Sequence, residues 1–277
     1  MDLWLETIGV FGIAALGMGL GHWASRSGVF SRTSALIITF SLVALVLLGH
    51  FPSLVYRWPM LYPLTVGRVR FVLLVFAVTL GLSTPLAQLT RPGMRMVTCV
   101  LMALFVSALT ILPFVGPAAV QGQLAAIQTE WDADGVCRQT LPFTCGAAAA
   151  VTALNRLGIE AHEGELAVAF RTSPIIGASV WTLYRVLDER YTPKGLSCSF
   201  AMFDAPDAIA QDGVMLAVMR DSVFGDHCVA VLKISAGGVT IADPAQGLIE
   251  LSTADFLSAW RGSGIILRRP AARIAAQ

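Results

Sequence analysis

Charge is scarce in this sequence, and lysine is almost absent. Of its 277 residues only 13% are charged and 56% are hydrophobic, whereas soluble proteins average about 25% and 45–50%. Residues 1–120 contain seven arginines, two acidic residues and no lysine. This half has a net charge of +5, and the remaining residues have a net charge of −4. The composition therefore predicts a membrane half followed by a mildly acidic soluble half.

Further absences exclude several common functions. No segment interleaves basic and aromatic residues, so no nucleic-acid partner is expected. No Cys-x-x-Cys or His-x-x-x-His spacing occurs, so neither a zinc site nor another cofactor is predicted. The N-terminal segment carries Asp2 and Glu6 but no positive charge, which is not typical of a secretory signal peptide.

Four apolar runs in residues 1–120 are long enough to cross a bilayer, which takes roughly 20 helical residues. They are Leu5–Trp23, Ser34–His50, Val69–Leu89 and Met96–Ala118. Tyrosines, Trp58 and prolines between the second and third runs suit a segment at the membrane surface. The last three runs contain no acidic residue, whereas transport pathways usually carry intramembrane charges. The helices are therefore expected to anchor the protein rather than to transport a solute.

The arginines predict an orientation, because positively charged loops tend to remain in the cytoplasm. The loops after the first and third runs carry Arg26, Arg32, Arg91 and Arg95. The loop between the second and third runs opposes them with three arginines. Four arginines thus favour one orientation and three the other. This majority, together with the acidic segment after the fourth run, predicts that the C-terminal half lies outside the cytoplasm.

Gly17 and Gly21 form a Gly-x-x-x-Gly pair in the first run. Small residues at this spacing let two helices approach closely. We favour packing inside the predicted four-helix bundle, and the alternative is a pairing face for another chain.

The second half is divided into a linker (121–134), a folded domain (135–268) and a basic tail (269–277). Helices are predicted from Cys145 to the stop at Gly158, and over Glu163–Phe170, Ser179–Glu189 and Thr253–Trp260. Strands are predicted over Leu196–Phe203, Val214–Met219, Cys228–Ile234, Val239–Ala242 and Ile265–Leu267, with a Gly237-Gly238 hairpin turn. Helices followed by strands indicate an α+β domain.

Four residues of this domain can together supply cysteine chemistry. Cys145 begins a helix, where unpaired N–H groups and the helix dipole favour a thiolate. Gln139 lies just upstream and can donate to an oxyanion. His227 begins one strand and Asp243 ends the next, so they can act as a base and its orienting group. Each alone has an ordinary structural interpretation, but their combination predicts a papain-like cysteine peptidase.

On these residues the domain resembles the C39 peptidase family, whose members cut double-glycine leader peptides from bacteriocin precursors. In that family a Gln lies six residues before the Cys, and the His about sixteen before an Asp-Pro, as Gln139 and His227 do here. The likeness extends from Gly135 to Leu267. It implies Cys145 as nucleophile, His227 as general base, Asp243 as its orienting group, and an oxyanion hole from Gln139 and the Cys145 N–H.

The sequence departs from the family in two respects. An acid often precedes the Cys, whereas Thr144 stands here. The best-known members are fused to an ABC transporter, but this sequence has no Gly-xxxx-Gly-Lys-Ser/Thr loop. We therefore expect a stand-alone, membrane-anchored member in a bacterial inner membrane, with its peptidase domain on the periplasmic side. Its substrate would be a leader or pro-segment of an exported or membrane protein, presented by a separate export or assembly machinery.

Two alternatives remain open at this point. The fold could serve as a non-catalytic module that binds a peptide, or the same thiol could transfer the acyl group to an amine as a transpeptidase. The site also suggests a Cys137–Cys228 disulfide, because these cysteines are close in sequence to Gln139 and His227, whereas Cys198 is expected in the core. The His162-Glu163 segment is expected to be a solvated helix start, and Asp226 an exposed turn residue.

Overall fold

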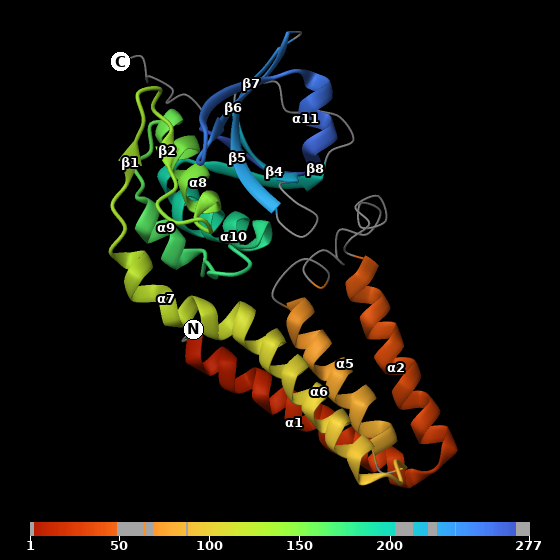
Figure 1. Cartoon of the computed structure of the whole chain (residues 1–277). Coiled ribbons are helices and arrows are strands. Elements are labelled where there is room, and N and C mark those ends of the chain that lie inside the picture. Colours follow the sequence, from red (N-terminus) through yellow and green to blue (C-terminus); the bar gives the residue numbers. More distant parts are fainter. Residues whose placement is uncertain are drawn as a thin grey trace. The chain divides into compact units, whose positions relative to one another are not determined.

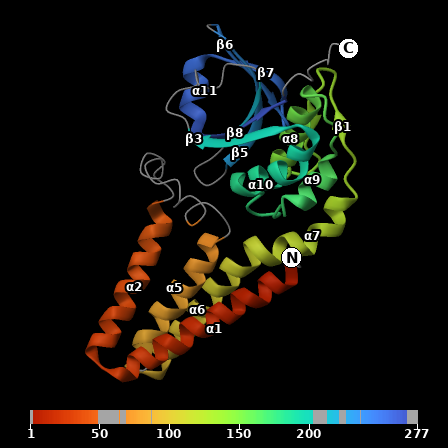
Figure 2. The ribbon, with the colours of Figure 1, turned by 180° about the vertical axis from the view of Figure 1, so that it is seen from behind.

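A computed structural model describes residues 3–48, 64, 69–86, 88–202, 213–220, 226–235 and 237–269. The chain divides into two compact units, residues 1–119 and 120–277. The first is helical, and the second combines helices with a sheet (Figures 1 and 2). The architecture is therefore a helical region followed by an α+β domain, as the sequence predicts.

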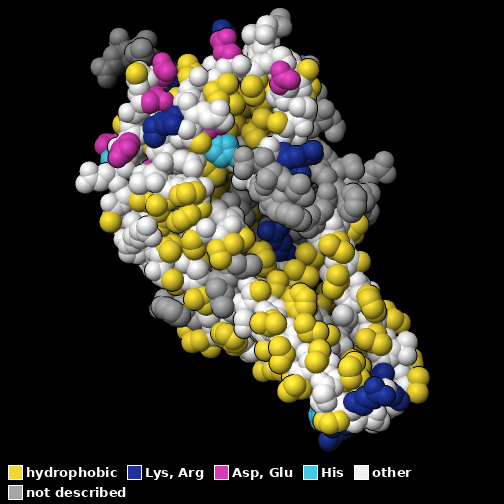
Figure 3. Space-filling model, in the orientation of Figure 1, with side chains coloured by type: hydrophobic (Ala, Val, Ile, Leu, Met, Phe, Trp, Pro, Cys, Tyr) yellow, Lys and Arg dark blue, Asp and Glu magenta, His cyan; other side chains and the backbone are white. Residues whose placement is uncertain are grey.

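The first unit consists of long apolar helices. They are α1 (Leu3–Ser27), α2 (Val29–Leu48), α5 (Val69–Leu86) and α6 (Pro92–Thr110), and α6 continues through a π-helical turn (Ile111–Val115) into α7 (Gly116–Ala125). By length and composition, four helices of the described residues could cross a membrane. Hydrophobic side chains cover most of the visible surface of this unit, and arginine side chains gather at one end of it (Figure 3).

The glycine pair of α1 packs against α5. A Cβ atom at Gly17 would lie 2.1 Å from the Thr79 Oγ1, and one at Gly21 would lie 2.0 Å from the Ser83 Oγ. The hydroxyls of Thr79 and Ser83 donate to carbonyl oxygens of α5 itself, so the helix backbone satisfies them. The favoured interpretation, packing inside the bundle, is confirmed.

Replacing Gly21 by valine is expected to destabilise the helical unit, because the added carbons would overlap α5. Overpacking of this kind typically costs about 1–3 kcal/mol. Thermal unfolding of the detergent-solubilised protein measures the effect. The matched control is Gly19→Val, because a Cβ atom at Gly19 meets no atom within 4 Å. Equal midpoints for the two variants would contradict the packing described here.

The second unit is built on one antiparallel sheet. Its helices are α8 (Cys145–Arg156), α9 (Glu163–Ala169), α10 (Val180–Tyr191), the 3-10 turn Thr192–Lys194 and α11 (Thr253–Ala259). The sheet has the order β3 (Ser197–Met202), β8 (Trp260–Arg268), β4 (Val214–Arg220), β5 (Asp226–Ser235), β6 (Gly238–Asp243) and β7 (Gly247–Leu251). A separate short pair, β1 (Glu130–Trp131) and β2 (Cys137–Arg138), precedes α8.

Two hydrophobic cores lie on the two faces of this sheet. Helices α8, α9 and α10 pack on one face, and α11 packs on the other through the fully buried Phe256. Figures 1 and 2 show α11 on the opposite side of the sheet from α8 in both views. Strand β4 is buried along six of its seven residues because both faces are covered.

Helix α8 is the central helix of the domain, and its small side chains explain its position. Residues 146–154 are all buried, and a Cβ atom at Gly146 would lie 3.2 Å from Leu183 of α10. The helix ends in a Schellman motif, in which the Gly158 N–H donates to Asn155 and the Ile159 N–H to Leu154. Gly158 adopts a positive φ of 69°. The predicted glycine stop is therefore confirmed.

The sequence locates most elements of the domain, but it does not predict the short strands β1 and β2, strand β7 or the start of β8. Strand β7 was not predicted, since it is a short edge strand whose residues are mostly exposed or half-buried. The last helix ends at Ala259, because Trp260 already has extended backbone angles. Strand β8 therefore begins five residues before the predicted Ile265.

Candidate active site

Cys145 is the first residue of α8. The preceding Thr144 occupies the N-cap position, but its hydroxyl donates to Glu163 and accepts no capping hydrogen bond from the helix N–H groups. The thiol therefore lies at the end of the helix where the dipole is positive. Its side chain is half-buried, whereas residues 146–154 of α8 are buried.

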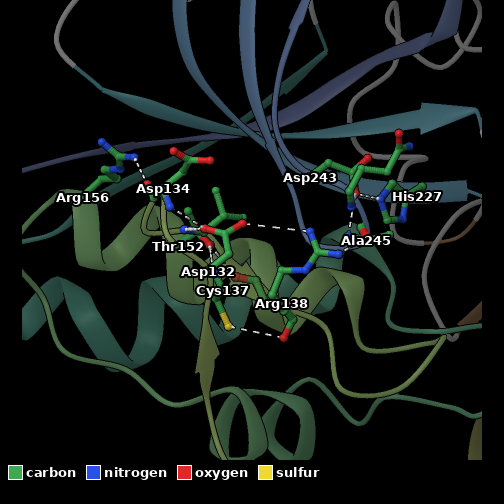
Figure 4. Close-up of polar contacts among 12 residues, drawn as sticks. Asp132, Asp134, Cys137, Arg138, Thr152, Arg156, His227, Asp243 and Ala245 are labelled. Carbon is green, nitrogen blue, oxygen red and sulfur yellow. Dashed lines mark hydrogen bonds and ion pairs between the residues drawn. The ribbon is translucent and has the colours of Figure 1, made fainter.

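His227 and Asp243 lie side by side on neighbouring strands. The register pairs Ala230 of β5 with Ala242 of β6, which makes residues 227 and 243 diagonal neighbours on one face. The His227 Nε2 lies 2.8 Å from the Asp243 Oδ1. Figure 4 shows the imidazole and the carboxylate facing each other.

The turn after β6 holds the Asp243 carboxylate in place. Its Oδ1 accepts hydrogen bonds from the Ala245 N–H at 2.7 Å and from the Gln246 N–H at 3.2 Å. The Asp243 side chain is only 5% exposed. Because the carboxylate cannot rotate freely, it also fixes the orientation of the His227 ring.

The electrostatics favour charged forms of His227 and Asp243. Burial alone lowers the pKa of His227, but hydrogen bonds to Asp243 and Cys145 and the charges of these groups outweigh it and raise the pKa to about 10. Burial raises the pKa of Asp243, but the hydrogen bonds from His227, Ala245 and Gln246 outweigh it and lower the pKa.

The imidazole lies between Asp243 and the thiol. Its Nε2 is engaged by Asp243, and Cys145 is close enough to contribute to its raised pKa. Since Nε2 is occupied, Nδ1 is the nitrogen left for the thiol. Three of the four predicted site residues, on α8, β5 and β6, are thus brought into one chain of contacts.

Gln139 reaches the site through its main chain. Its N–H donates to the Pro244 carbonyl at 3.0 Å, in the turn that holds Asp243. Its side-chain Oε1 is buried, with no hydrogen-bond partner within the described part of the chain. The structure therefore places Gln139 beside Asp243, on the segment that leads into Cys145.

Arg138 makes a second contact between strand β2 and the turn after β6. The sequence analysis did not predict this contact. Its guanidinium donates to the Ala245 carbonyl and lies 4.0 Å from the Asp132 carboxylate (Figure 4). The neighbouring Cys137 N–H donates to the Thr152 hydroxyl of α8 at 2.9 Å. Strand β2 therefore contacts both helix α8, which begins at Cys145, and the turn after β6.

Glu163 is the clearest correction to the sequence analysis. It was expected in a solvated helix start, but it is fully buried. Its carboxylate accepts hydrogen bonds from Thr140 and Thr144. Asp226 is exposed, as expected, but it is the first residue of β5 rather than a turn residue, and it pairs with Arg261.

The predicted Cys137–Cys228 disulfide is wrong, because all five cysteines of the chain are free. Burial, with the charges of Glu163, Asp132 and Glu130, raises the pKa of Cys137 to about 12. Burial, with the charge of Cys145, raises the pKa of Cys228 well above its usual value. The two thiols thus face different groups, and both are protonated core residues. Burial also raises the pKa of Cys198 to about 12.

Three comparisons show which known proteins this chain is similar to. The Peptidase C39 family profile matches residues 135–272. An uncharacterised protein of Methanothermobacter marburgensis is 29% identical over 136 residues, which are 48% of this chain and 88% of that protein. The double-glycine-motif protease of an AMS/PCAT transporter, solved with a leader peptide, is 17% identical with a TM-score of 0.41, over 52% of this chain and 96% of that one.

The peptidase domain of Streptococcus ComA, a bifunctional ABC transporter, is also 17% identical, with a TM-score of 0.40 over 48% of this chain and 96% of that one.

Within the described residues, no cluster of three His, Cys, Asp or Glu side chains is arranged to hold a metal ion. The family match covers the described site residues Gln139, Cys145, His227 and Asp243. Residues 135–272 of this chain therefore belong to the Peptidase C39 family.

Proposed function

We propose that this protein is a membrane-anchored cysteine peptidase that uses Cys145, His227 and Asp243. The observation that carries the proposal is the 2.8 Å contact between the His227 ring and the Asp243 carboxylate, with Cys145 at the start of α8 close enough to raise the pKa of the ring. This is the arrangement that a nucleophile, a base and an orienting group require. A thiol at a helix N-terminus beside an imidazolium is stabilised as the thiolate.

The residues fit an acyl-enzyme reaction. The Cys145 thiolate attacks the carbonyl carbon of the scissile peptide bond, and the His227 imidazolium gives its proton to the departing amine. The thioester that remains is attacked by water, and the neutral His227 ring accepts the proton of that water. Cleavage of the thioester releases the new carboxylic acid and restores the thiolate–imidazolium pair.

The oxyanion formed in each step needs hydrogen-bond donors. We assign this role to the Cys145 N–H and the side-chain amide of Gln139. Two features support the assignment: the helix N-terminus supplies unpaired N–H groups, and the Gln139 main chain is fixed beside Asp243. The Gln139 side chain is half-buried, and its Oε1 has no hydrogen-bond partner among the described residues.

The helical half suggests where the substrate is found. We propose that the four apolar helices cross the bacterial inner membrane and hold the peptidase domain at the periplasmic surface. Exposed Arg26, Arg91 and Arg95 at one end of the bundle support a cytoplasmic position for that end. The substrate would then be a leader or pro-segment of an exported or membrane-associated protein.

The test is a comparison of protein N-termini, determined by mass spectrometry, in wild-type cells and in a Cys145→Ala strain. We expect a set of N-termini in the membrane and exported fractions that the mutant strain lacks. A Cys198→Ala strain is the control, because it loses another thiol of the same domain. Identical N-termini, with the variant expressed and folded, would refute proteolysis and leave a binding module. Products joined to an amine at the new C-terminus would identify a transpeptidase instead.

A further inference from the structure

Glu163 is the most deeply buried acidic residue near the candidate active site. It is the first residue of α9 and is 0% exposed. Burying a carboxylate is costly unless hydrogen bonds replace its water. A chain that keeps an acid in such a position must compensate it with close donors.

The compensation comes from the segment that precedes Cys145. The Glu163 Oε1 accepts hydrogen bonds from the Thr140 N–H at 2.9 Å and the Thr144 hydroxyl at 2.6 Å. Its Oε2 accepts one from the Thr140 hydroxyl at 2.8 Å. Thr140 directly follows Gln139, and Thr144 directly precedes Cys145. One carboxylate thus contacts the neighbours of both predicted functional residues.

The backbone around Glu163 is fixed by its contacts with residues 124–129. Its N–H donates to the Thr129 hydroxyl at 2.9 Å. A Cβ atom at the next residue, Gly164, would lie 2.7 Å from the carbonyl oxygens of Leu124 and Ile127. Because Gly164 lacks this atom, the start of α9 packs directly on residues 124–129. The carboxylate therefore has little room to move away from the segment it holds.

We propose that Glu163 is a positioning residue, which holds residues 139–145 so that the Cys145 thiol faces His227 and Gln139 stays at the oxyanion. The inference rests on the peptidase function proposed above. A group that only stabilised the fold could bond anywhere on this loop. Glu163 instead bonds at its two ends, next to the two residues whose placement decides the reaction.

Kinetics of the full-length protein in detergent tests the role, with a peptide that spans the cleavage site found by the N-terminal comparison. Glu163→Gln keeps the shape but removes the charge and one acceptor, and kcat is expected to fall ~10- to 100-fold, since small misplacements of reacting groups have effects of this size. KM should change less than about threefold, because Glu163 does not touch the substrate. The matched control is Glu165→Gln, an exposed acid of the same helix.

Thr144 provides a second, milder pair of variants. Thr144→Val removes one donor to Glu163 at nearly constant volume and should also lower kcat, whereas Thr144→Ser keeps the hydroxyl and should retain it. These variants decide the question if Glu163→Gln does not fold, which thermal unfolding reveals. Unchanged kcat in folded Glu163→Gln, or in folded Thr144→Val where the former does not fold, would overturn the positioning role.

A second readout does not depend on peptidase activity. Trypsin cleaves after Arg138 and Arg156, and the peptide between them contains Cys145 as its only cysteine. The rate at which iodoacetamide modifies this peptide in the folded protein is expected to fall ~10-fold in Glu163→Gln and to stay constant in Glu165→Gln. A slowed rate in a protein that cleaves nothing would refute the peptidase function and keep the positioning role. An unchanged rate would refute the positioning role.

Discussion

Replacing His227 by glutamine is expected to lower kcat/KM for peptide cleavage by ~10⁴-fold, the size of effect seen when one member of a catalytic triad is lost. Glutamine can still hydrogen-bond to Asp243, but it can neither carry the positive charge that stabilises the thiolate nor deliver a proton to the departing amine. The measurement is the rate of cleavage of a synthetic peptide by the purified full-length protein.

Two further variants show whether His227 acts together with Cys145. Because the nucleophile and base function as a unit, Cys145→Ala combined with His227→Gln should lose no more activity than Cys145→Ala alone. His162→Gln is the control, since His162 is an exposed histidine of the same domain with a side chain 56% exposed. If His227→Gln kept activity within ~10-fold of the wild type, the base would have to be another residue.

The site could be predicted from the sequence because its parts belong to local structures. A cysteine followed by small residues and a glycine stop predicts a helix that begins at the thiol, and α8 confirms it. His227 and Asp243 lie on two strands that follow each other in the chain and pair as a hairpin, which brings the start of one beside the end of the other. Neither step requires knowledge of the tertiary fold.

The surroundings of the site were harder to predict because they depend on distant contacts. The segment of Glu163 looks like a solvated helix start, and only its hydrogen bonds to residues 140–144 explain its burial. Arg138 gives no local signal of its contact with Ala245, 107 positions away. The disulfide prediction failed for a related reason. Proximity of Cys137 and Cys228 to site residues along the chain does not determine where their thiols point.

The difference between local signals and contacts of distant residues applies to the helical half as well. The apolar runs are a local property of the sequence, and they predicted four helices long enough to span a membrane. The partner of the Gly17–Gly21 face is a tertiary property, and it could only be proposed until α5 was seen to place Thr79 and Ser83 against it. Helix ends also shifted, since α1 continues to Ser27, four residues beyond the predicted end.

Asp243→Asn is expected to lower kcat by ~10²- to 10⁴-fold and to move the alkaline limit of activity to lower pH. In the wild type the pKa of His227 is raised to about 10, so the imidazolium to which the proposed mechanism assigns protonation of the leaving amine is lost only as the pH rises through about 10. Asp243 contributes to that raised pKa through its hydrogen bond and its charge. Asparagine has no charge, so the proton of His227 should dissociate at lower pH.

Rates of peptide cleavage measured from neutral pH to pH 11 separate this electrostatic effect from a loss of folding. The control is Asp226→Asn, which removes the exposed acid next to His227 in sequence, an acid that pairs with Arg261 instead. Its alkaline limit should coincide with that of the wild type. If the limit of Asp243→Asn also stayed in place, Asp243 would orient the His227 ring without sustaining its charge. The drop in kcat would then measure the loss of orientation alone, because the Asp243 carboxylate, held by the Ala245 and Gln246 N–H groups, orients the ring in the wild type.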